Sequence, residues 1–346
     1  MAKNRGVSTD LSDIDITNVR IEQNGQLDLF SILDPASRPQ EDYSNTVDLY
    51  DAIPKYVWGP REHEDLKSAT LTRHCTLRGN KLVVKLKPAI IEKDGRTVLI
   101  YPGQREELVE DALRKIAVSG QAVSVNDKAG VSFTLYELMK ELEKMGHTYD
   151  LNEIKEALFV YRGAIMECYS EDGTAVINSS LFGLVGLTTR QDIKEGRAER
   201  CFVQFNPLVN DSIMNLTFRQ YNYKIGMDIR SPLARFVYKR MAQYWTQASE
   251  NNPYTPNLVT FLGQSPRGLT EKMGENLRAM RNALDTLKKH KVVSRYVEHK
   301  VLQGKQKVID AQYEVYPHPD FVKEVIKANQ RKKQVQTQSL RLETGL

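Results

Sequence analysis

Two amphipathic helices separated by a four-residue turn constrain the fold of this chain most. Each helix begins with a capping box, an acceptor side chain followed three residues later by a glutamate: Thr134 with Glu137, and Asp150 with Glu153. Apolar residues then recur at spacings of three and four in both segments, 135–145 and 151–165. Only Gly146–Tyr149 lies between them. Helices joined so tightly must cross at a steep angle, so the sequence predicts a helix-turn-helix unit.

Strand-like segments surround this unit. The runs Leu82–Leu86 and Thr97–Tyr101 precede it and are predicted to be joined through the turn signal Lys93–Gly95. Three further strands are predicted after it: Ile165–Tyr169, Ala175–Asn178 and Cys201–Phe205. A third helical stretch lies before the helix pair. Three helices followed by a hairpin are the order of a winged helix, which we assign to residues 66–225.

The same order of elements recurs in residues 226–328. Ser231 and Pro232 supply the N-cap and first residue of a helix, and Thr255–Pro256 repeats this start signal for a short one. The remaining predicted elements are a long helix and two strands that flank a tip with a glycine: 269–290, 292–301 and 308–316. We therefore predict an α+β fold of two tandem winged-helix domains, with a C-terminal tail at 329–346.

The charge of the chain is distributed unevenly. Its net charge is +5, but residues 226–333 hold about 20 Lys and Arg against about 10 Asp and Glu. Residues 1–60 are acidic and rich in Asp, Asn, Ser and Pro. We therefore expect residues 1–65 to form a largely disordered tail, with folded structure beginning near Leu82. The second winged helix is predicted to meet an anion.

The outer face of the predicted long helix carries side chains that can read DNA. Projection at 100° per residue places Arg278 and Asn282 opposite the apolar stripe, and these side chains can pair with guanine and adenine. Cations at the helix end, on the strand and on the wing suit phosphates. The predicted DNA-binding residues are Arg267, Lys272, Arg278, Arg281, Asn282, Lys288, Lys289, Lys291, Arg295, Lys305 and Lys307. The alternative is an ordinary solvated face whose lysines complement the helix C-terminus.

The matching helix of the first domain has a mixed and partly acidic outer face. Its outward residues are Asn152, Glu153, Lys155, Glu156 and Arg162. Such a face is poorly suited to a phosphate backbone. We therefore expect the first winged helix to contact a second protomer and the second one to read the groove of double-stranded DNA.

A short motif stands in the acidic tail. The pentapeptide consists of Gln26, Leu27, Asp28, Leu29 and Phe30, and it matches the consensus by which bacterial proteins dock on the DNA polymerase sliding clamp. The glutamine is a polar anchor, while Leu29 and Phe30 are compact enough to fill a preformed apolar pocket. The alternative is a short strand or helix packed on the first domain.

Together these features resemble plasmid replication initiators of the Rep superfamily. Three features are shared: a neutral winged helix before a basic one, the helix start Ser231–Arg240 and the tail motif. The tail motif makes the TrfA type the most similar. The resemblance implies binding to repeated origin sequences called iterons and opening of neighbouring DNA. It also implies recruitment of host DnaA, replicative helicase and sliding clamp, and a homodimer in equilibrium with a monomer.

Enzymatic functions are disfavoured, and we expect no catalytic residues, cofactor or metal site. The chain lacks a Gly-x-x-x-x-Gly-Lys-Ser/Thr phosphate loop and a His-x-His pair. Cys75, Cys168 and Cys201 have neither disulfide nor zinc-site spacing. No apolar run approaches the roughly 20 residues that cross a bilayer, so we expect a cytoplasmic protein associated with the plasmid or nucleoid.

Two other function classes stay open on sequence alone. One is a winged-helix transcriptional repressor or activator, and the other is a partition or chromosome-architecture protein. The clamp motif and the two-copy architecture argue against the first, since a repressor has no use for a polymerase clamp. The Arg and Asn pattern of the long helix argues against the second, since such a protein does not need to read bases.

Overall fold

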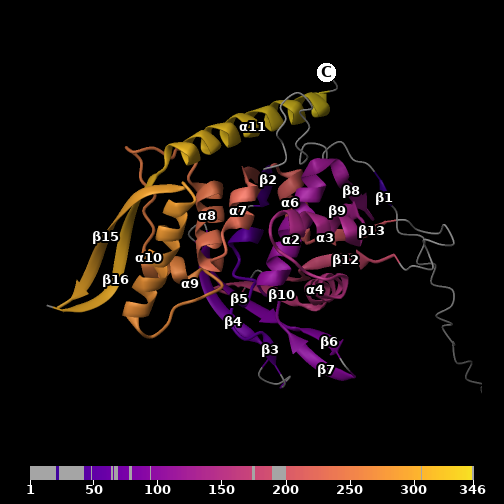
Figure 1. Ribbon diagram of the computed structural model, residues 1–346, viewed down its shortest axis with the longest axis horizontal. Coiled ribbons are helices and arrows are strands. Elements are labelled where there is room, and N and C mark those ends of the chain that lie inside the picture. The colour runs from indigo at the N-terminus through magenta and orange to yellow at the C-terminus, as the bar shows by residue number, and fades with distance from the viewer. Residues whose placement is uncertain are drawn as a thin grey trace, which may run out of the picture.

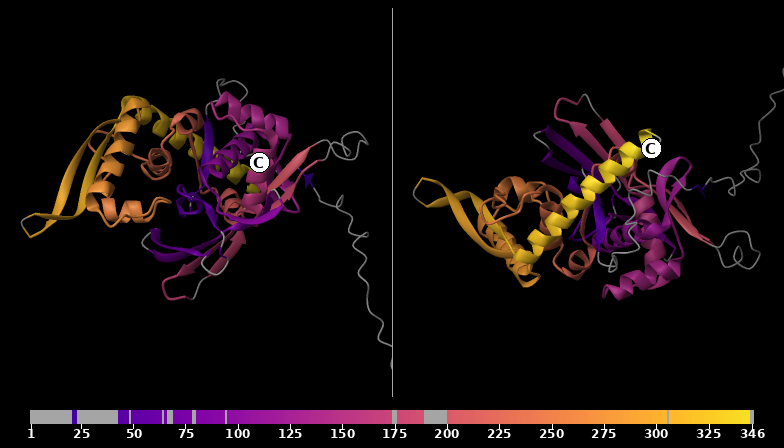
Figure 2. Two further views of the ribbon diagram at one scale, coloured as in Figure 1. Left: turned by 60° about the horizontal axis from the view of Figure 1, so that its bottom comes forward. Right: turned by 90° about the horizontal axis from the view of Figure 1, so that it is seen from above.

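A computed structural model gives the arrangement of the chain (Figure 1). It describes residues 21–22, 43–47, 49–63, 65, 69–77, 80–93, 95–173, 176–188, 200–304 and 306–344. Two bodies of helices and sheets lie side by side along the longest axis, and the last helix runs across both (Figure 2).

The first body is built around three helices: α2 (Gln104–Ile116), α3 (Leu135–Lys144) and α4 (Leu151–Gly163). Both predicted capping boxes are confirmed, because the Thr134 hydroxyl and the Asp150 carboxylate accept from the backbone N–H groups of Glu137 and Glu153. The turn between α3 and α4 needs a glycine. Gly146 has a φ of 74°, and a Cβ there would lie 2.6 Å from the guanidinium of Arg230.

Among the described residues, three sheets of three or more strands belong to the first body. The five-stranded sheet has the order β1 (Ile21–Glu22), β8 (Ala122–Val125), β9 (Lys128–Phe133), β13 (Cys201–Phe205) and β12 (Phe182–Gly186). The four-stranded sheet has the order β11 (Val176–Ser180), β10 (Ile165–Ser170), β5 (Asn80–Lys87) and β4 (Leu71–Leu77). The three-stranded sheet has the order β3 (Glu62–His63), β7 (Arg96–Ile100) and β6 (Ala89–Lys93).

Strand pairing differs from the prediction in one place. The segments 82–86 and 97–101 were expected to share one hairpin, but β5 pairs with β4 and β10, whereas β7 pairs with β6. The predicted turn at Gly95 is present, but it closes the β6–β7 hairpin. Strand β4 was missed because its polar residues, such as His74, interrupt the apolar pattern.

The second body repeats the winged-helix order. Its elements are α8 (Pro232–Tyr244), α9 (Leu258–Gly263), α10 (Met273–Lys289), β15 (Val293–Gln303) and β16 (Lys307–Pro317). The predicted α+β fold with two tandem winged helices is thus confirmed. Helix α10 begins four residues later than expected, because the Asn276 side chain accepts from the Thr270 N–H at 3.0 Å and donates to the Thr270 carbonyl at 2.8 Å. These bonds hold the preceding segment outside the helix. Helix α9 likewise begins at Leu258 rather than just after Thr255.

Residues 43–47 and 49–56 belong to the folded body, although the sequence predicts a largely disordered tail at 1–65 and folded structure only from about Leu82. Strand β2 (Tyr43–Val47) pairs antiparallel with β14 (Phe218–Asn222), which lies between α6 (Pro207–Met214) and α7 (Tyr223–Asp228). Val47, Tyr50 and Ile53 are buried in the main core. This early segment therefore pairs with a strand that lies more than 170 residues later in the sequence.

Helix α11 (Pro319–Thr344) includes most of the predicted C-terminal tail. It starts at the end of β16 and crosses to the first body (Figures 1 and 2). Three side chains of α11 are buried: Phe321, Val325 and Val335. The Glu324 carboxylate accepts hydrogen bonds from Asn222 at 3.0 Å and from the Tyr238 hydroxyl at 3.4 Å. The helix therefore fastens the two bodies together.

A buried group of charged side chains joins α2 of the first body to α8 of the second. Arg235 and Glu107 form an ion pair at 3.2 Å, and their side chains are 0% and 3% exposed. Lys239 contacts Asp111 at 2.5 Å and Glu107 at 3.5 Å. Burial alone would raise the pKa of Glu107, but the charges of Arg235 and Lys239 outweigh it and hold this pKa below its usual value. Glu107 is therefore charged and paired, whereas burial raises the pKa of Asp111 despite its contact with Lys239.

Replacing Glu107 with alanine should strongly destabilise the chain. Arg235 would keep its charge in a fully buried site without its carboxylate partner, which costs about 3 to 5 kcal/mol. Urea unfolding monitored by tryptophan fluorescence measures this loss. Lys81→Ala is the control, because its pair with Glu171 is exposed to solvent and should contribute less than about 1 kcal/mol. Equal free energies of unfolding for the Glu107 and Lys81 variants would contradict the large stabilisation expected from the buried pair.

The stability contributed by Glu324 should depend on pH. Burial raises its pKa from 4.5 to about 7, so between these values the folded chain binds more protons than the unfolded chain, and the free energy of unfolding falls as pH rises. Glu324→Gln removes this titration. As the pH rises from about 5 to about 8, the free energy of unfolding of this variant should increase by more than about 1 kcal/mol relative to that of the wild type. Urea unfolding measures this difference. A constant difference, as expected for the exposed control Glu171→Gln, would refute the role of Glu324.

Candidate nucleic-acid interface

The outward face of α10 presents a set of polar and basic side chains to solvent. Arg278 and Asn282 are exposed on it, whereas Leu277, Met280 and Leu284 of the same helix are buried. The projection made from the sequence therefore places these two residues correctly. Among the described residues, no hydrogen bond or ion pair engages the Arg278 guanidinium. The guanidinium is therefore accessible to a ligand, and an arginine can pair with the edge of a guanine.

Arg281 is engaged within the protein. Its Nε and Nη2 atoms donate to both oxygens of Glu298 on β15, at 2.7 and 2.6 Å, and the Tyr313 hydroxyl donates to the same carboxylate at 2.8 Å. The hydrogen bonds that Arg281 donates to Glu298 hold the pKa of Arg281 above its usual value. This bidentate pair ties α10 to the β15–β16 hairpin. Arg281, which the sequence predicts to bind DNA, is therefore engaged by Glu298 in this structure.

Arg267 also has an internal partner. Its guanidinium donates to Asn276 Oδ1 at 2.9 Å and to the Gly268 carbonyl at 3.1 Å. Gly268 adopts a φ of 70°, which favours glycine. The pair organises the turn before α10. Lys272, at the other end of that turn, is exposed and lies 3.5 Å from Glu275.

The remaining predicted cations lie at the end of α10 and on the hairpin. Lys288, Lys289, Lys291 and Lys307 are all exposed. Lys288 lies over the Tyr296 ring, 5.9 Å from its centroid. Arg295 stacks on Tyr316 with its guanidinium carbon 3.4 Å from the ring centroid, and it contacts the exposed Glu250 at 3.2 Å. Exposed pairs of this kind exchange readily for phosphates. Lys305 lies outside the described residues, as does the whole motif Gln26–Phe30.

The carboxylates of the second winged helix were not part of the predicted site. Glu298 fixes Arg281, and Asp285 accepts from the Tyr296 hydroxyl at 3.3 Å. Both contacts link α10 to β15. No signal in the sequence pointed to either contact, because each partner lies on another element.

The outer face of α4 differs from that of α10. Glu156 is surrounded by Arg105 at 2.7 Å, Lys93 at 3.7 Å and Arg61 at 4.0 Å. Leu151 and Phe159 of this helix are 38% and 48% exposed. A face with satisfied charges and exposed apolar side chains favours protein contact over phosphate contact.

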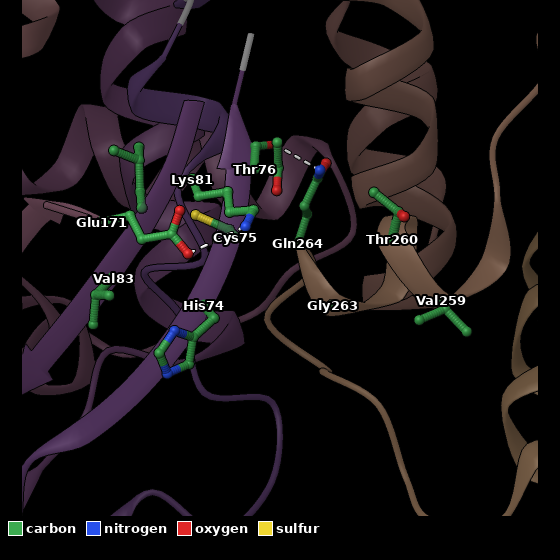
Figure 3. Close-up of a pocket in the computed structure, with 11 residues that line it drawn as sticks. His74, Cys75, Thr76, Lys81, Val83, Glu171, Val259, Thr260, Gly263 and Gln264 are labelled. Carbon is green, nitrogen blue, oxygen red and sulfur yellow. Dashed lines mark hydrogen bonds and ion pairs between the residues drawn. The ribbon is translucent and has the colours of Figure 1, made fainter. Parts of the chain in front are cut away.

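A cleft lies where the four-stranded sheet of the first body meets α9 of the second (Figure 3). It holds about 290 Å³ and is lined by His74, Cys75, Thr76, Lys81, Leu82, Val83, Glu171, Val259, Thr260, Gly263 and Gln264. The Gln264 amide donates to the Thr76 carbonyl across it at 2.5 Å. Lys81 and Glu171 pair on its rim. We assign it to the seam between the two bodies.

In the part of the chain that the structure describes, no three His, Cys, Asp or Glu side chains come together in a way that would hold a metal ion. No helix in the same part is long and apolar enough to span a bilayer.

Comparisons with known proteins give only distant matches. No protein-family model and no curated protein matches this chain. A structure of RctB domains 2 and 3 covers 81% of this chain and 99% of its own length, with 9% identity and a TM-score of 0.46. A structure of the Pi initiator protein in complex with iteron DNA covers 62% of this chain and 91% of its own length, with 9% identity and a TM-score of 0.44. Both TM-scores lie below 0.5, so the function is inferred below from this chain's own residues.

Arg278→Ala should weaken binding to duplex DNA without changing stability. Its side chain is exposed, and the loss of a base or phosphate contact costs about 1 to 3 kcal/mol of binding free energy. Fluorescence anisotropy with a labelled duplex measures the change. Arg162→Ala, at an exposed arginine of α4, is the matched control and should bind as the wild type does. The reverse outcome, a loss with Arg162→Ala alone, would assign DNA binding to the first winged helix.

Proposed function

We propose that this chain binds double-stranded DNA through its second winged helix and initiates replication of a plasmid. The observation that carries the DNA-binding part is the exposed set of Arg278, Asn282 and the lysines of α10 and β16. Arg278 and Asn282 lie on α10, whose orientation to the hairpin that carries Lys307 is fixed by the Arg281–Glu298 pair. A rigid helix with free arginine and asparagine side chains is suited to the major groove, and flanking lysines are suited to phosphates.

Replication initiation is favoured over simple regulation by the tail motif. A clamp-docking pentapeptide at Gln26–Phe30 serves a protein that loads or positions the replication machinery. The DNA target would be the repeated sequences of a plasmid origin. Sliding clamp, DnaA and replicative helicase would be the partners. The α4 face, with its exposed Leu151 and Phe159, would serve a homodimer that dissociates to a monomer.

The second candidate function is transcriptional repression or activation by the same DNA-binding face. Nothing about α10 distinguishes the two roles, because both require sequence-specific binding to a duplex. The tail motif separates them, since a repressor that never starts replication does not need the clamp.

A replication assay tests the initiator function. The gene and its upstream DNA are placed on a small circle in a host that cannot otherwise replicate that circle. The wild type should maintain it. Leu29→Ala combined with Phe30→Ala should lose maintenance and clamp binding in a pull-down, while duplex affinity is unchanged. Duplex binding without maintenance by the wild type would instead favour the regulatory function.

A further inference from the structure

The outer half of the β15–β16 hairpin extends beyond the body of the second winged helix (Figure 1). At its base, Val293, Tyr313 and Val315 are buried in the core. From His299 to Ile309, every described side chain is exposed except that of Val308, which is half-buried. The hairpin is therefore longer than its packing on α10 requires.

Three large apolar side chains lie on this outer half. Val301, Leu302 and Ile309 are 44%, 51% and 41% exposed. A two-stranded hairpin in water gains little from such residues, because there is no third layer to cover them. Apolar side chains gathered at the end of a projecting element mark a contact with another molecule.

The charge around these residues favours a polyanion as that molecule. Residues 299–309 contain three lysines and no Asp or Glu, and Lys300 and Lys307 are exposed. The carboxylates that flank the segment have internal partners: Glu298 pairs with Arg281, and Asp310 accepts from the backbone N–H of Val259 at 2.9 Å. The outer half thus combines cations with uncovered apolar groups, the composition of hairpins and wedges that enter a DNA groove.

The hairpin also has the reach to touch the duplex held by α10. The two elements run antiparallel, since Lys288 lies beside Tyr296 and Arg281 beside Glu298. From Glu298 to Gln303 the strand advances about 16 Å, whereas α10 extends about 12 Å from Arg281 back to Met273. The end of the hairpin therefore lies well clear of the Arg281–Glu298 contact and projects away from the second winged helix (Figure 1). A projection of this length can reach the minor groove next to a major groove that receives α10.

We propose that Val301, Leu302 and Ile309 form an apolar wedge that enters this minor groove and partly unstacks one base step at the end of the bound site. Lys300 and Lys307 contact the phosphates on either side. The wedge rests on the proposed binding of duplex DNA, and it adds a device for distorting that DNA. Its consequence is a bound duplex that is weakened locally, at a fixed distance from the bases read by α10.

Fluorescence of 2-aminopurine tests the wedge with the full chain. The probe is a short duplex selected from a random pool by binding to the wild type, with 2-aminopurine placed at one position at a time. At saturation, the wild type should raise the fluorescence at one or two adjacent positions near one end of the site. Leu302→Ala combined with Ile309→Ala should lose most of this rise, while Kd stays within about fivefold of the wild-type value. Val297→Ala is the control, because Val297 is similarly exposed but lies nearer the packed base.

Leu302→Lys combined with Ile309→Lys gives a second arm. It should bind the same duplex at least as tightly, since it adds two cations, and still give no rise. Binding by the wild type without a rise at any position would overturn the wedge alone. A rise in 2-aminopurine fluorescence as large as that of the wild type with both double variants would also overturn the wedge. Failure of the wild type to select any duplex would overturn the proposed DNA binding together with the wedge.

Discussion

The buried contact between α2 and α8 fixes how the two winged helices sit against each other. Arg235 is fully buried, and its charge is balanced by Glu107, while Lys239 holds Asp111. Such charges tolerate few alternative arrangements, because any displacement leaves one of them unpaired in a dry site. Helix α11 adds a second connection through Glu324, Asn222 and Tyr238. The basic face of α10 is therefore presented in a set direction relative to the first body.

The proposed DNA-binding surface also depends on contacts within the protein. Only part of its positive charge is free, because Arg281 and Arg267 hold α10 against the hairpin and the preceding turn. Arg278, Asn282 and the lysines at the helix end are left to meet a ligand. Rigid placement of the free groups lowers the ordering cost of binding. On α4 of the first winged helix, Glu156 is paired with cations and Leu151 and Phe159 are exposed.

Local signals in the sequence predicted much of this fold. The capping boxes at Thr134 and Asp150, the Ser231–Pro232 helix start and both wing hairpins depend on neighbouring residues, and the structure contains all of them. Long-range contacts were not predictable in the same way. Strand β2 pairs with β14 across about half of the chain. The partner of Arg281 lies on another element, so a helical projection sees the arginine but not Glu298. Helix α11 continues beyond the expected boundary because Val335 and Ser339 are buried on the helix face that Phe321 and Val325 begin.

The most direct test of DNA binding by the second winged helix is a salt titration of duplex affinity. The wild type should show a steep linear fall of log K with log salt concentration, since each neutralised phosphate contributes about 0.9 to the slope. Replacing Lys288, Lys289 and Lys291 with alanine should make the slope shallower by about one unit for each lost contact. Replacing Lys155 on α4 should leave it unchanged. A slope that responds to Lys155 and not to the α10 lysines would contradict the central claim.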